Sequence, residues 1–400
     1  MLRVAFLVYD LDGPGGMQRQ AIRLAGCLLA RGLEVAFVST AAPRDLPARL
    51  GRAVPGLPGA PVLRVPTTRA PLFEAAARAW LAARGGADVL YAVGWNAALH
   101  AARLGERTHA PVVVKYACAG AHGDFAWVAG TPGALPLLQR AARHVCLSGA
   151  LRDEALAAGL PAPRLVSIPN GVDLAAWSAE VAPARLPWPA EAGPVALFLG
   201  RLAVQKRVDV LLEAFARVAA RVPAARLALA GDGPLRRALQ ERAAALGLDE
   251  RVAFLGQRDD VLALHRAARV VVLPSEGEGL SNVLLEALAA GTPVVATDVP
   301  GAREVVTPDV EALLVAPNDP AALAEALARA LEDPALAAAL AAAGRARARA
   351  AFDLEGVADR YAALFTEVAA EHAPGPRRGV PERVGALVRA LRRGRRGAPG

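Results

Sequence analysis

Glu278 and Glu286 stand eight positions apart, the first in a loop broken by glycines and the second in an otherwise apolar stretch. A carboxylate can accept hydrogen bonds from two neighbouring hydroxyl groups, so this pair indicates a ligand rich in hydroxyls. Asn282 precedes Glu286 by four residues and would share its face of a helix. A solvated Glu286 is the alternative, but this helix has almost no other polar residue with which to build an exposed face.

Arg201 and Lys206 form a second group of residues whose side chains could bind a ligand or take part in catalysis. They follow an apolar strand at residues 195–199 and flank a short loop that begins with Gly200. Cations in a loop at the carboxyl edge of a parallel sheet can hold a phosphate group. Only Lys115 and Lys206 are lysines among the 46 basic residues, which favours a specific use of the ammonium group. A solvated basic turn is the alternative.

A strand, a loop, a helix and a second strand are expected to position the two glutamates. Residues 270–273 predict a buried parallel strand, 274–279 the loop, and about 281–290 a helix that stops at Gly291. Residues 294–297 predict the next strand. In such a unit, the loop after the first strand and the amino end of the helix face the ligand crevice of an open parallel sheet.

Strands alternate with helices over most of the chain, which predicts the α/β class. In the first half, strands are expected at residues 4–8, 34–38, 62–65, 89–92, 112–115, 145–147 and 165–168. In the second half, they are expected at residues 195–199, 226–230, 252–255, 270–273 and 294–297. Asp-Pro pairs at residues 319–320 and 333–334 predict two helix starts, with the aspartate as N-cap.

A proline-rich segment at residues 179–194 lacks periodicity and marks a linker. We therefore expect two Rossmann-like parallel-sheet domains, at residues 1–178 and 195–351, facing a central cleft. A helix at residues 352–373 is expected to return to the N-terminal domain, and the basic tail at 374–400 follows it.

Two segments of the second half carry a family resemblance. GRLAVQKRVDVLLEAF at residues 200–215 and PSEGEGLSNVLLEALAAGTPVVATDVPG at 274–301 resemble the diphosphate-binding and donor segments of retaining group 1 glycosyltransferases. GDGP at 231–234 and IPNGVD at 168–173 are similar to other loops of this family. The resemblance covers the chain to about His372. It implies the two-domain B-type fold, with an acceptor-side N-terminal domain and a nucleotide-sugar donor domain after it.

The resemblance also implies site residues and a reaction. Arg201 and Lys206 would stabilise the leaving phosphate. Glu278 would contact the transferred sugar, and Glu286 the ribose hydroxyls. In a retaining transfer without a covalent intermediate, the departing phosphate itself can deprotonate the acceptor, so Arg201, Lys206 and Glu278 are the expected catalytic residues. The donor would be a nucleoside diphosphate sugar, with no cofactor and no metal required. The expected donor-binding residues are Gly16, Gly200, Gly279, Leu280, Asn282 and Glu286.

The first half resembles the family less sharply. Gly15 and Gly16 look like its glycine loop, which would bring Gly16 near the diphosphate or the acceptor; a plain turn is the alternative. His122 and Asp124 follow a central strand at a position displaced from the family's histidine. Candidate residues of the cleft or the acceptor side are Gly15, Lys115, His122 and Asn170. The acceptor is expected to be a glycan, a lipid or a small molecule, in the synthesis of a cell-surface polysaccharide, glycolipid or related glycan.

Composition bears on the setting of the protein. No uninterrupted apolar stretch reaches the roughly 20 residues needed to cross a bilayer, and the first apolar run is too short for a secretory signal. The three cysteines are odd in number and lack metal-ligand spacing, which favours a reduced, cytoplasmic protein.

The positive charge is concentrated at the end of the chain. Residues 374–400 hold eight arginines and one glutamate, which sum to +7 of the net charge of +8. The body is nearly neutral, so the charge does not indicate a nucleic-acid partner. Val384, Leu387, Val388 and Leu391 have helical spacing, which fits a short amphipathic helix on the anionic cytoplasmic face of a membrane. A disordered basic extension is the alternative.

Three other functional classes were weighed. A nicotinamide-dependent oxidoreductase predicts G-x-G-x-x-G after the first strand and an acidic residue after the second, but the chain has DLDGPGGMQ and then Ser39-Thr40. A sugar-nucleotide epimerase of similar shape fits the two C-terminal motifs less well. A non-catalytic nucleotide-sugar binding protein is the third class, and the presence of Arg201, Lys206, Glu278 and Glu286 argues against a decayed site.

Overall fold

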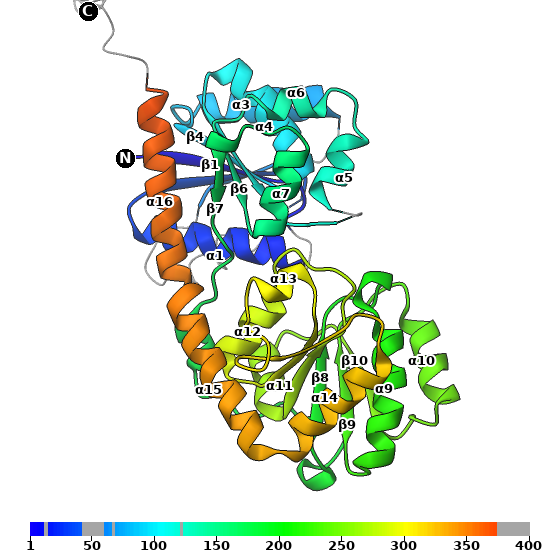
Figure 1. Ribbon diagram of the computed structural model, residues 1–400. Coiled ribbons are helices and arrows are strands. Elements are labelled where there is room, and N and C mark those ends of the chain that lie inside the picture. The colour runs from blue at the N-terminus through cyan, green and yellow to red at the C-terminus, as the bar shows by residue number, and fades with distance from the viewer. Residues whose placement is uncertain (12–14, 42–59, 66–68, 121–122, 374–400) are drawn as a thin grey trace, which may run out of the picture.

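The computed structural model describes residues 1–11, 15–41, 60–65, 69–120 and 123–373 (Figure 1). They form two α/β domains, each built on a parallel sheet, and a long C-terminal helix that packs on the N-terminal domain. The predicted fold class is confirmed. His122 and the basic tail at 374–400 lie outside the described residues.

The N-terminal domain contains a parallel sheet in the order β3-β2-β1-β4-β5-β6-β7. Its strands are β1 (Arg3–Val8), β2 (Glu34–Ser39), β3 (Val62–Arg64), β4 (Val89–Val93), β5 (Val112–Tyr116), β6 (Arg143–Cys146) and β7 (Leu165–Ser167). The chain proceeds outward from β1 on one side and from β4 on the other. The loops after β1 and β4 therefore lie at the switch point of the sheet, where open α/β sheets bind ligands.

The C-terminal domain repeats this arrangement in the order β10-β9-β8-β11-β12-β13. Its strands are β8 (Val195–Leu199), β9 (Arg226–Ala230), β10 (Val252–Gly256), β11 (Val270–Leu273), β12 (Val294–Thr297) and β13 (Leu313–Val315). Here β8 and β11 are the neighbours at the switch point. The loop with Arg201 and Lys206 follows β8, and the loop with Glu278 follows β11. Two motifs far apart in sequence thus meet at one sheet edge.

Helices cover the two sheets (Figure 1). Those of the N-terminal domain and the segment after it are α1 (Gly16–Ala30), α3 (Ala70–Ala82), α4 (Trp95–Thr108), α5 (Asp124–Ala129), α6 (Ala134–Leu138), α7 (Gly149–Ala157) and α8 (Leu174–Ser178). Those of the C-terminal domain are α9 (Val208–Arg221), α10 (Arg236–Ala245), α11 (Val261–Ala267), α12 (Asn282–Ala290), α13 (Pro300–Arg303), α14 (Pro320–Glu332) and α15 (Pro334–Ala351). Among the described residues, no helix is both long and apolar enough to span a bilayer.

Local sequence signals explain many of the helix ends. Asp319 and Asp333 accept hydrogen bonds from backbone N–H groups of the first turns of α14 and α15, as the two Asp-Pro pairs predicted. Ser281 caps α12 in the same way, and Gly291 ends it in the left-handed conformation. The helix that carries Glu286 is therefore fixed at both ends.

Some short elements differ from the sequence prediction. Strand β13 and helix α13 were not predicted, because three or four residues are too few to show a period. Strand β6 begins at Arg143, ahead of the predicted strand at 145–147, since Arg143 pairs with Val113 of β5. The proline-rich linker contains a short 3₁₀ helix, η2 (Ala190–Ala192).

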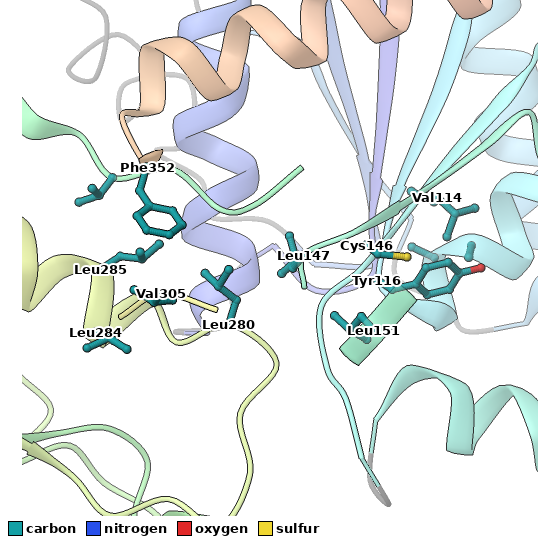
Figure 2. Close-up of a cluster of buried hydrophobic side chains, with 14 of the residues drawn as sticks. Val114, Tyr116, Cys146, Leu147, Leu151, Leu280, Leu284, Leu285, Val305 and Phe352 are labelled. Atoms are coloured by element: carbon teal, nitrogen blue, oxygen red, sulfur yellow. The ribbon is translucent and has the colours of Figure 1, made fainter. Parts of the chain in front are cut away.

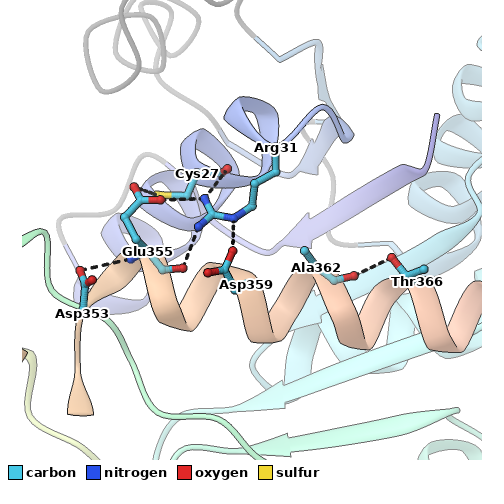
Figure 3. Close-up of polar contacts among 7 residues, drawn as sticks. All are labelled: Cys27, Arg31, Asp353, Glu355, Asp359, Ala362 and Thr366. Atoms are coloured by element: carbon cyan, nitrogen blue, oxygen red, sulfur yellow. Dashed lines mark hydrogen bonds and ion pairs between the residues drawn. The ribbon is translucent and has the colours of Figure 1, made fainter. Parts of the chain in front are cut away.

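The C-terminal helix α16 (Leu354–Glu371) packs on the N-terminal domain beside α1. Figure 3 shows Arg31, which directly follows α1, between two acidic residues of α16: its Nη1 lies 2.8 Å from Glu355 Oε2, and its Nε lies 2.7 Å from Asp359 Oδ1. Where the chain crosses back, Val172 N donates to Phe352 O and Leu354 N donates to Val172 O. The two interdomain crossings therefore lie side by side.

One hydrophobic cluster includes buried side chains of both domains (Figure 2). Val114, Tyr116 and Leu147 belong to the N-terminal domain, whereas Leu280 and Leu285 belong to the C-terminal domain. Burial of apolar surface across this boundary favours contact between the domains. It also brings the carboxyl edges of the two sheets toward the same region.

Candidate functional site

Glycines allow the loops at the edge of the C-terminal sheet to pack closely. Gly200 directly follows β8 with a φ of +153°, and Gly231 follows β9 with a φ of +140°. A Cβ atom on Gly231 would lie only 1.9 Å from the carbonyl oxygen of Gly200. Both positions therefore require glycine. The loop that carries Arg201 and Lys206 is held against its neighbour by backbone contacts.

Lys206 and Glu278 form an ion pair between the loops after β8 and β11. Lys206 Nζ lies 2.5 Å from Glu278 Oε1, and the Ser275 hydroxyl donates to the same oxygen over 2.7 Å. The side chains of the pair are 21% and 17% exposed. A half-buried pair that reaches solvent can exchange one partner for a charged or hydroxylated ligand.

Arg201 differs from Lys206 in its surroundings. Its side chain is exposed, and it makes no ion pair with any residue that the structure describes. The following Leu202 is buried and anchors the loop beneath it. The guanidinium group of Arg201 therefore remains available to an anion at the sheet edge.

Glu286 is buried in the middle of α12 and faces the N-terminal domain. Its Oε1 lies 3.2 Å from Nη1 of Arg23, on α1. Burial raises the pKa of the Glu286 carboxyl, and the positive charge of Arg23 opposes this rise. The second glutamate of the motif is thus already paired with a cation from the other domain.

Asn282 joins the two domains through a chain of polar side chains. Its Oδ1 accepts hydrogen bonds from Asn170 Nδ2 at 2.8 Å and from Gln20 Nε2 at 3.1 Å. Asn170 Oδ1 in turn accepts from Lys115 Nζ at 2.7 Å. Burial lowers the pKa of Lys115 to about 7. Three predicted site residues, Lys115, Asn170 and Asn282, therefore form one connected chain.

Gly16 and Gly279 lie where the backbone of one domain closely approaches the other domain. A Cβ atom on Gly16 would lie 2.3 Å from Nδ2 of Asn282, and one on Gly279 would lie 2.3 Å from the carbonyl oxygen of Ala117. The absence of a side chain therefore permits contact between protein segments at both positions. A Cβ on Gly15 would meet only the flexible end of Gln18. Leu280 is buried in the shared hydrophobic cluster.

Comparisons with known proteins agree with this architecture. Residues 187–347 match the family model described as glycosyl transferases group 1, and residues 14–176 match that of glycosyltransferase family 4. The chain is 34% identical over 374 residues to the phosphatidyl-myo-inositol mannosyltransferase of Mycobacterium leprae, covering 90% of this chain and 95% of the relative. It belongs to the group 1 glycosyltransferases.

Two further similarities place this glycosyltransferase among its relatives. It is 38% identical over 239 residues to the D-inositol 3-phosphate glycosyltransferase of Geodermatophilus obscurus, which is 56% of this chain and 52% of the relative. The crystal structure of Anabaena HepE in complex with UDP-glucose has a TM-score of 0.77 and 23% identity, covering 92% of this chain and all of HepE. At this identity, the likeness shows that HepE and this chain share a fold.

Several residues of this glycosyltransferase's interdomain site were not predicted from its sequence. Arg23, Gln20 and Ser275 contact the predicted residues, but none was predicted as a site residue, although Ser275 lies within the quoted segment 274–301. The spacing of Gly16, Gln20 and Arg23 could have indicated that these residues lie together, because positions three and four apart share one helix face. Their partners on α12, Asn282 and Glu286, could be identified only from the structure.

Asp124 anchors the loops at the switch point of the N-terminal sheet. Its carboxylate accepts hydrogen bonds from three backbone N–H groups, those of Trp95, Ala117 and Cys118. Burial raises the pKa of Asp124, and these hydrogen bonds oppose the rise. The sequence indicates Asp124 as a cleft candidate beside His122, and the structure places it at the start of α5 with its carboxylate turned to the backbone.

Proposed function

We propose that this glycosyltransferase moves a sugar from a nucleoside diphosphate sugar to an acceptor hydroxyl with retention at the anomeric carbon. The observation that carries the proposal is the ion pair between Lys206 Nζ and Glu278 Oε1 at the switch point of the C-terminal sheet. There a cation for a phosphate and a carboxylate for sugar hydroxyls are adjacent. A ligand in which a phosphate is bonded to a sugar would place its two parts against these two side chains.

The diphosphate of the donor would bind between Arg201 and Lys206. A unit positive charge about 4 Å from a phosphate charge attracts it by roughly 4 kcal/mol at an effective dielectric constant near 20. This attraction grows as negative charge develops on the departing group, so it stabilises the transition state more than the bound substrate. We infer that these two cations replace a metal ion, and that the transfer needs no metal or cofactor.

The sugar and the ribose would use the two glutamates. Glu278 would accept hydrogen bonds from hydroxyls of the transferred sugar, while Lys206 turns from Glu278 to the phosphate. Glu286 would accept from the ribose diol while Arg23 keeps it ionised. That HepE was crystallised with UDP-glucose supports a donor of this class.

The proposed step conserves atoms and charge. The bond between the anomeric carbon and the phosphate oxygen breaks, and the electron pair leaves with the phosphate. The acceptor hydroxyl attacks from the same face, and its proton passes to an oxygen of the departing phosphate. The protein supplies cations and orientation. The inositol phosphate and phosphatidylinositol named for two relatives support an acceptor with many hydroxyls, free or carried on a lipid, in the synthesis of a glycolipid or related glycan.

The test is to screen UDP-, GDP-, ADP- and TDP-sugars for binding and for slow hydrolysis, with and without EDTA. Lys206→Ala and Glu286→Ala should weaken both. Arg237→Ala is the matched control, because Arg237 pairs with Glu241 on the outer face of α10 and is 92% exposed. If no sugar nucleotide binds, or if both variants bind as well as the parent, the proposal is wrong. Conversion of the donor to another sugar nucleotide would instead indicate an epimerase, and binding without turnover a non-catalytic binding protein.

A further inference from the structure

A pocket of about 260 Å³ opens at the switch point of the N-terminal sheet. Residues from the carboxyl ends of β1 and β4 line it, together with the start of α1 and the helix α5. Its lining includes Tyr9, Asp10, Gln18, Trp95, Asn96 and Trp127, and we call it the tryptophan pocket. Open α/β sheets bind ligands at such a position, so the location itself favours a binding site.

Two stacked indole rings form one wall of the tryptophan pocket. The ring centroids of Trp95 and Trp127 are 5.5 Å apart and their planes differ by 3°. Trp127 is 54% exposed, although it is one of the largest apolar side chains of the protein. A large aromatic surface that stays open to solvent beside a pocket is typical of a contact site for a ligand.

Buried contacts hold this aromatic wall in place. The backbone N–H of Trp95 donates to Asp124 Oδ1 over 3.0 Å, and the carboxylate of Asp124 also binds the backbone at Ala117 and Cys118. Gly94, with a φ of +81°, turns the chain from β4 into this wall. The indole pair is therefore preorganised, which lowers the entropic cost of binding a ring against it.

Polar groups beside the aromatic wall complete the recognition surface. Asn96 and Gln18 carry amide groups that both donate and accept hydrogen bonds, and Asp10 carries a carboxylate. A sugar or cyclitol ring has a face of C–H groups and a rim of hydroxyls. Its C–H face matches an indole, and its rim matches amides and a carboxylate.

The tryptophan pocket adjoins the proposed donor site through Cys118. Cys118 lines the pocket, and its thiol lies close enough to Glu278 and Lys206 that their charges shift its pKa in opposite directions. Next to it, Ala117 approaches Gly279 of the opposite domain. A ring in the pocket would thus be near the ion pair that we assign to the sugar and the leaving phosphate.

We propose that the tryptophan pocket binds the acceptor, and that the acceptor group is a single six-membered polyhydroxyl ring stacked on Trp127. This inference rests on the proposed function, which supplies the donor next to it. The volume of about 260 Å³ lies just below the range of ligand pockets, which is about 300–1,000 Å³, and this favours one ring over an extended oligosaccharide. The ring can belong to a soluble saccharide or to the headgroup of a glycolipid.

The test titrates myo-inositol, methyl glucoside and octyl glucoside, with open-chain sorbitol as the non-ring control, and follows tryptophan fluorescence. At least one ring compound should give saturable quenching at millimolar concentrations, and sorbitol should give none. Trp127→Ala should weaken ring binding about three- to tenfold and Trp127→Phe should restore most of it. Trp80→Ala, a half-buried tryptophan of α3 outside the pocket, is the matched control. Equal binding of methyl and octyl glucoside would indicate a soluble acceptor, and tighter binding of octyl glucoside a lipid-borne one.

Binding of the donor separates this proposal from the proposed function. Trp127→Ala should bind the donor as the parent protein does, because the ring of Trp127 stacks on Trp95 of the N-terminal domain. Unchanged ring binding in Trp127→Ala, or no saturable quenching by any ring compound, would overturn the acceptor site while the donor still binds. Loss of donor binding in the parent protein would instead overturn the proposed function.

Discussion

Arg23 of α1 and Glu286 of α12 form an ion pair across the two domains, with 3.2 Å between Nη1 and Oε1. Glu286 is only 7% exposed, and a carboxylate at this depth keeps its charge only with a nearby cation. The residue that we assign to the ribose of the donor therefore depends on the opposite domain for its ionisation. Donor binding and the contact between α1 and α12 should be linked.

We expect Arg23→Ala to weaken binding of a nucleoside diphosphate, and the loss to depend on pH. Without Arg23, the effect of burial on Glu286 is opposed by the smaller influence of the Arg19 charge, so the pKa of Glu286 rises further and more of the carboxyl is protonated near neutral pH. The protonated form binds a diol less well, so the loss should be about tenfold at about pH 6 and should shrink as the pH rises. Calorimetric titration from about pH 6 to 8 measures it.

Arg237→Ala serves as the control for Arg23→Ala, since it removes an arginine from an exposed ion pair on α10. Its affinity should match that of the parent at every pH. Tighter binding by Arg23→Ala would contradict the prediction, because it would mean that Arg23 competes with the ribose for Glu286.

Lys115 should make the free energy of unfolding depend on pH in the alkaline range. Burial lowers its pKa from 10.5 to about 7, so between these values the unfolded chain binds a proton that the folded protein does not. The free energy of unfolding therefore rises with pH in this window, by up to about 1.4 kcal/mol per pH unit from this group. Below pH 7, both states hold the proton and the destabilisation is fully present. Lys115→Met should remove this part of the slope, as measured by urea unfolding at about pH 6.5, 8 and 9.5.

A parallel slope in Lys115→Met and the parent would show that Lys115 is charged in the folded protein. Arg237→Met is the control for the loss of a long basic side chain at an exposed position. It should keep the slope of the parent.

The sequence predicted the strands that carry the site because their apolar runs are long and buried. Strands β8, β9 and β12 have the predicted bounds, and the two motif loops follow β8 and β11 as expected. Glu286 could be singled out because it is the one charge in an apolar helix. Its ion pair with Arg23 could not be predicted, since it depends on how two domains joined by a linker come together.

The tryptophan pocket could not be predicted from the sequence either. Trp95 and Trp127 are separated in sequence by the rest of α4, by β5 and by a loop, and no spacing rule pairs residues of two different helices. Only the tertiary structure, in which α5 returns over the amino end of α4, brings their rings together. Short elements such as β13 could not be predicted either, because their hydrogen bonds to the neighbouring strand define them.

Lys206→Ala should lower the turnover number more than it raises the KM for the donor. The attraction of about 4 kcal/mol estimated for one cation corresponds to about a thousandfold in rate if it acts mainly in the transition state. Ser275→Ala removes one hydrogen bond to the Glu278 carboxylate but no charge, so its effect should be smaller, about ten- to a hundredfold. Steady-state kinetics of donor hydrolysis give both parameters. A change in KM alone would show that Lys206 binds the ground state and the transition state equally.

Cys118 should report the distance between the tryptophan pocket and the donor site. It is the exposed cysteine of the three, since Cys27 and Cys146 are buried, so iodoacetamide should modify it first. Its pKa is raised to about 11, mainly because neighbouring atoms desolvate the thiol and also because Asp124 and Glu278 are negative. Only the thiolate reacts, so the rate should be low near pH 8 and should rise about tenfold per pH unit toward pH 10.

Variants that remove a charge from the C-terminal domain test whether that domain lies close to Cys118. Glu278→Gln removes a negative charge near Cys118, so it should lower the pKa of the thiol and speed its modification at a fixed pH. Lys206→Ala removes a positive charge and should slow it. Glu241→Gln, on the outer face of α10, is the control and should leave the rate unchanged. If Glu278→Gln and Lys206→Ala react at the rate of the parent, the two domains do not approach each other in solution as closely as the shared site requires.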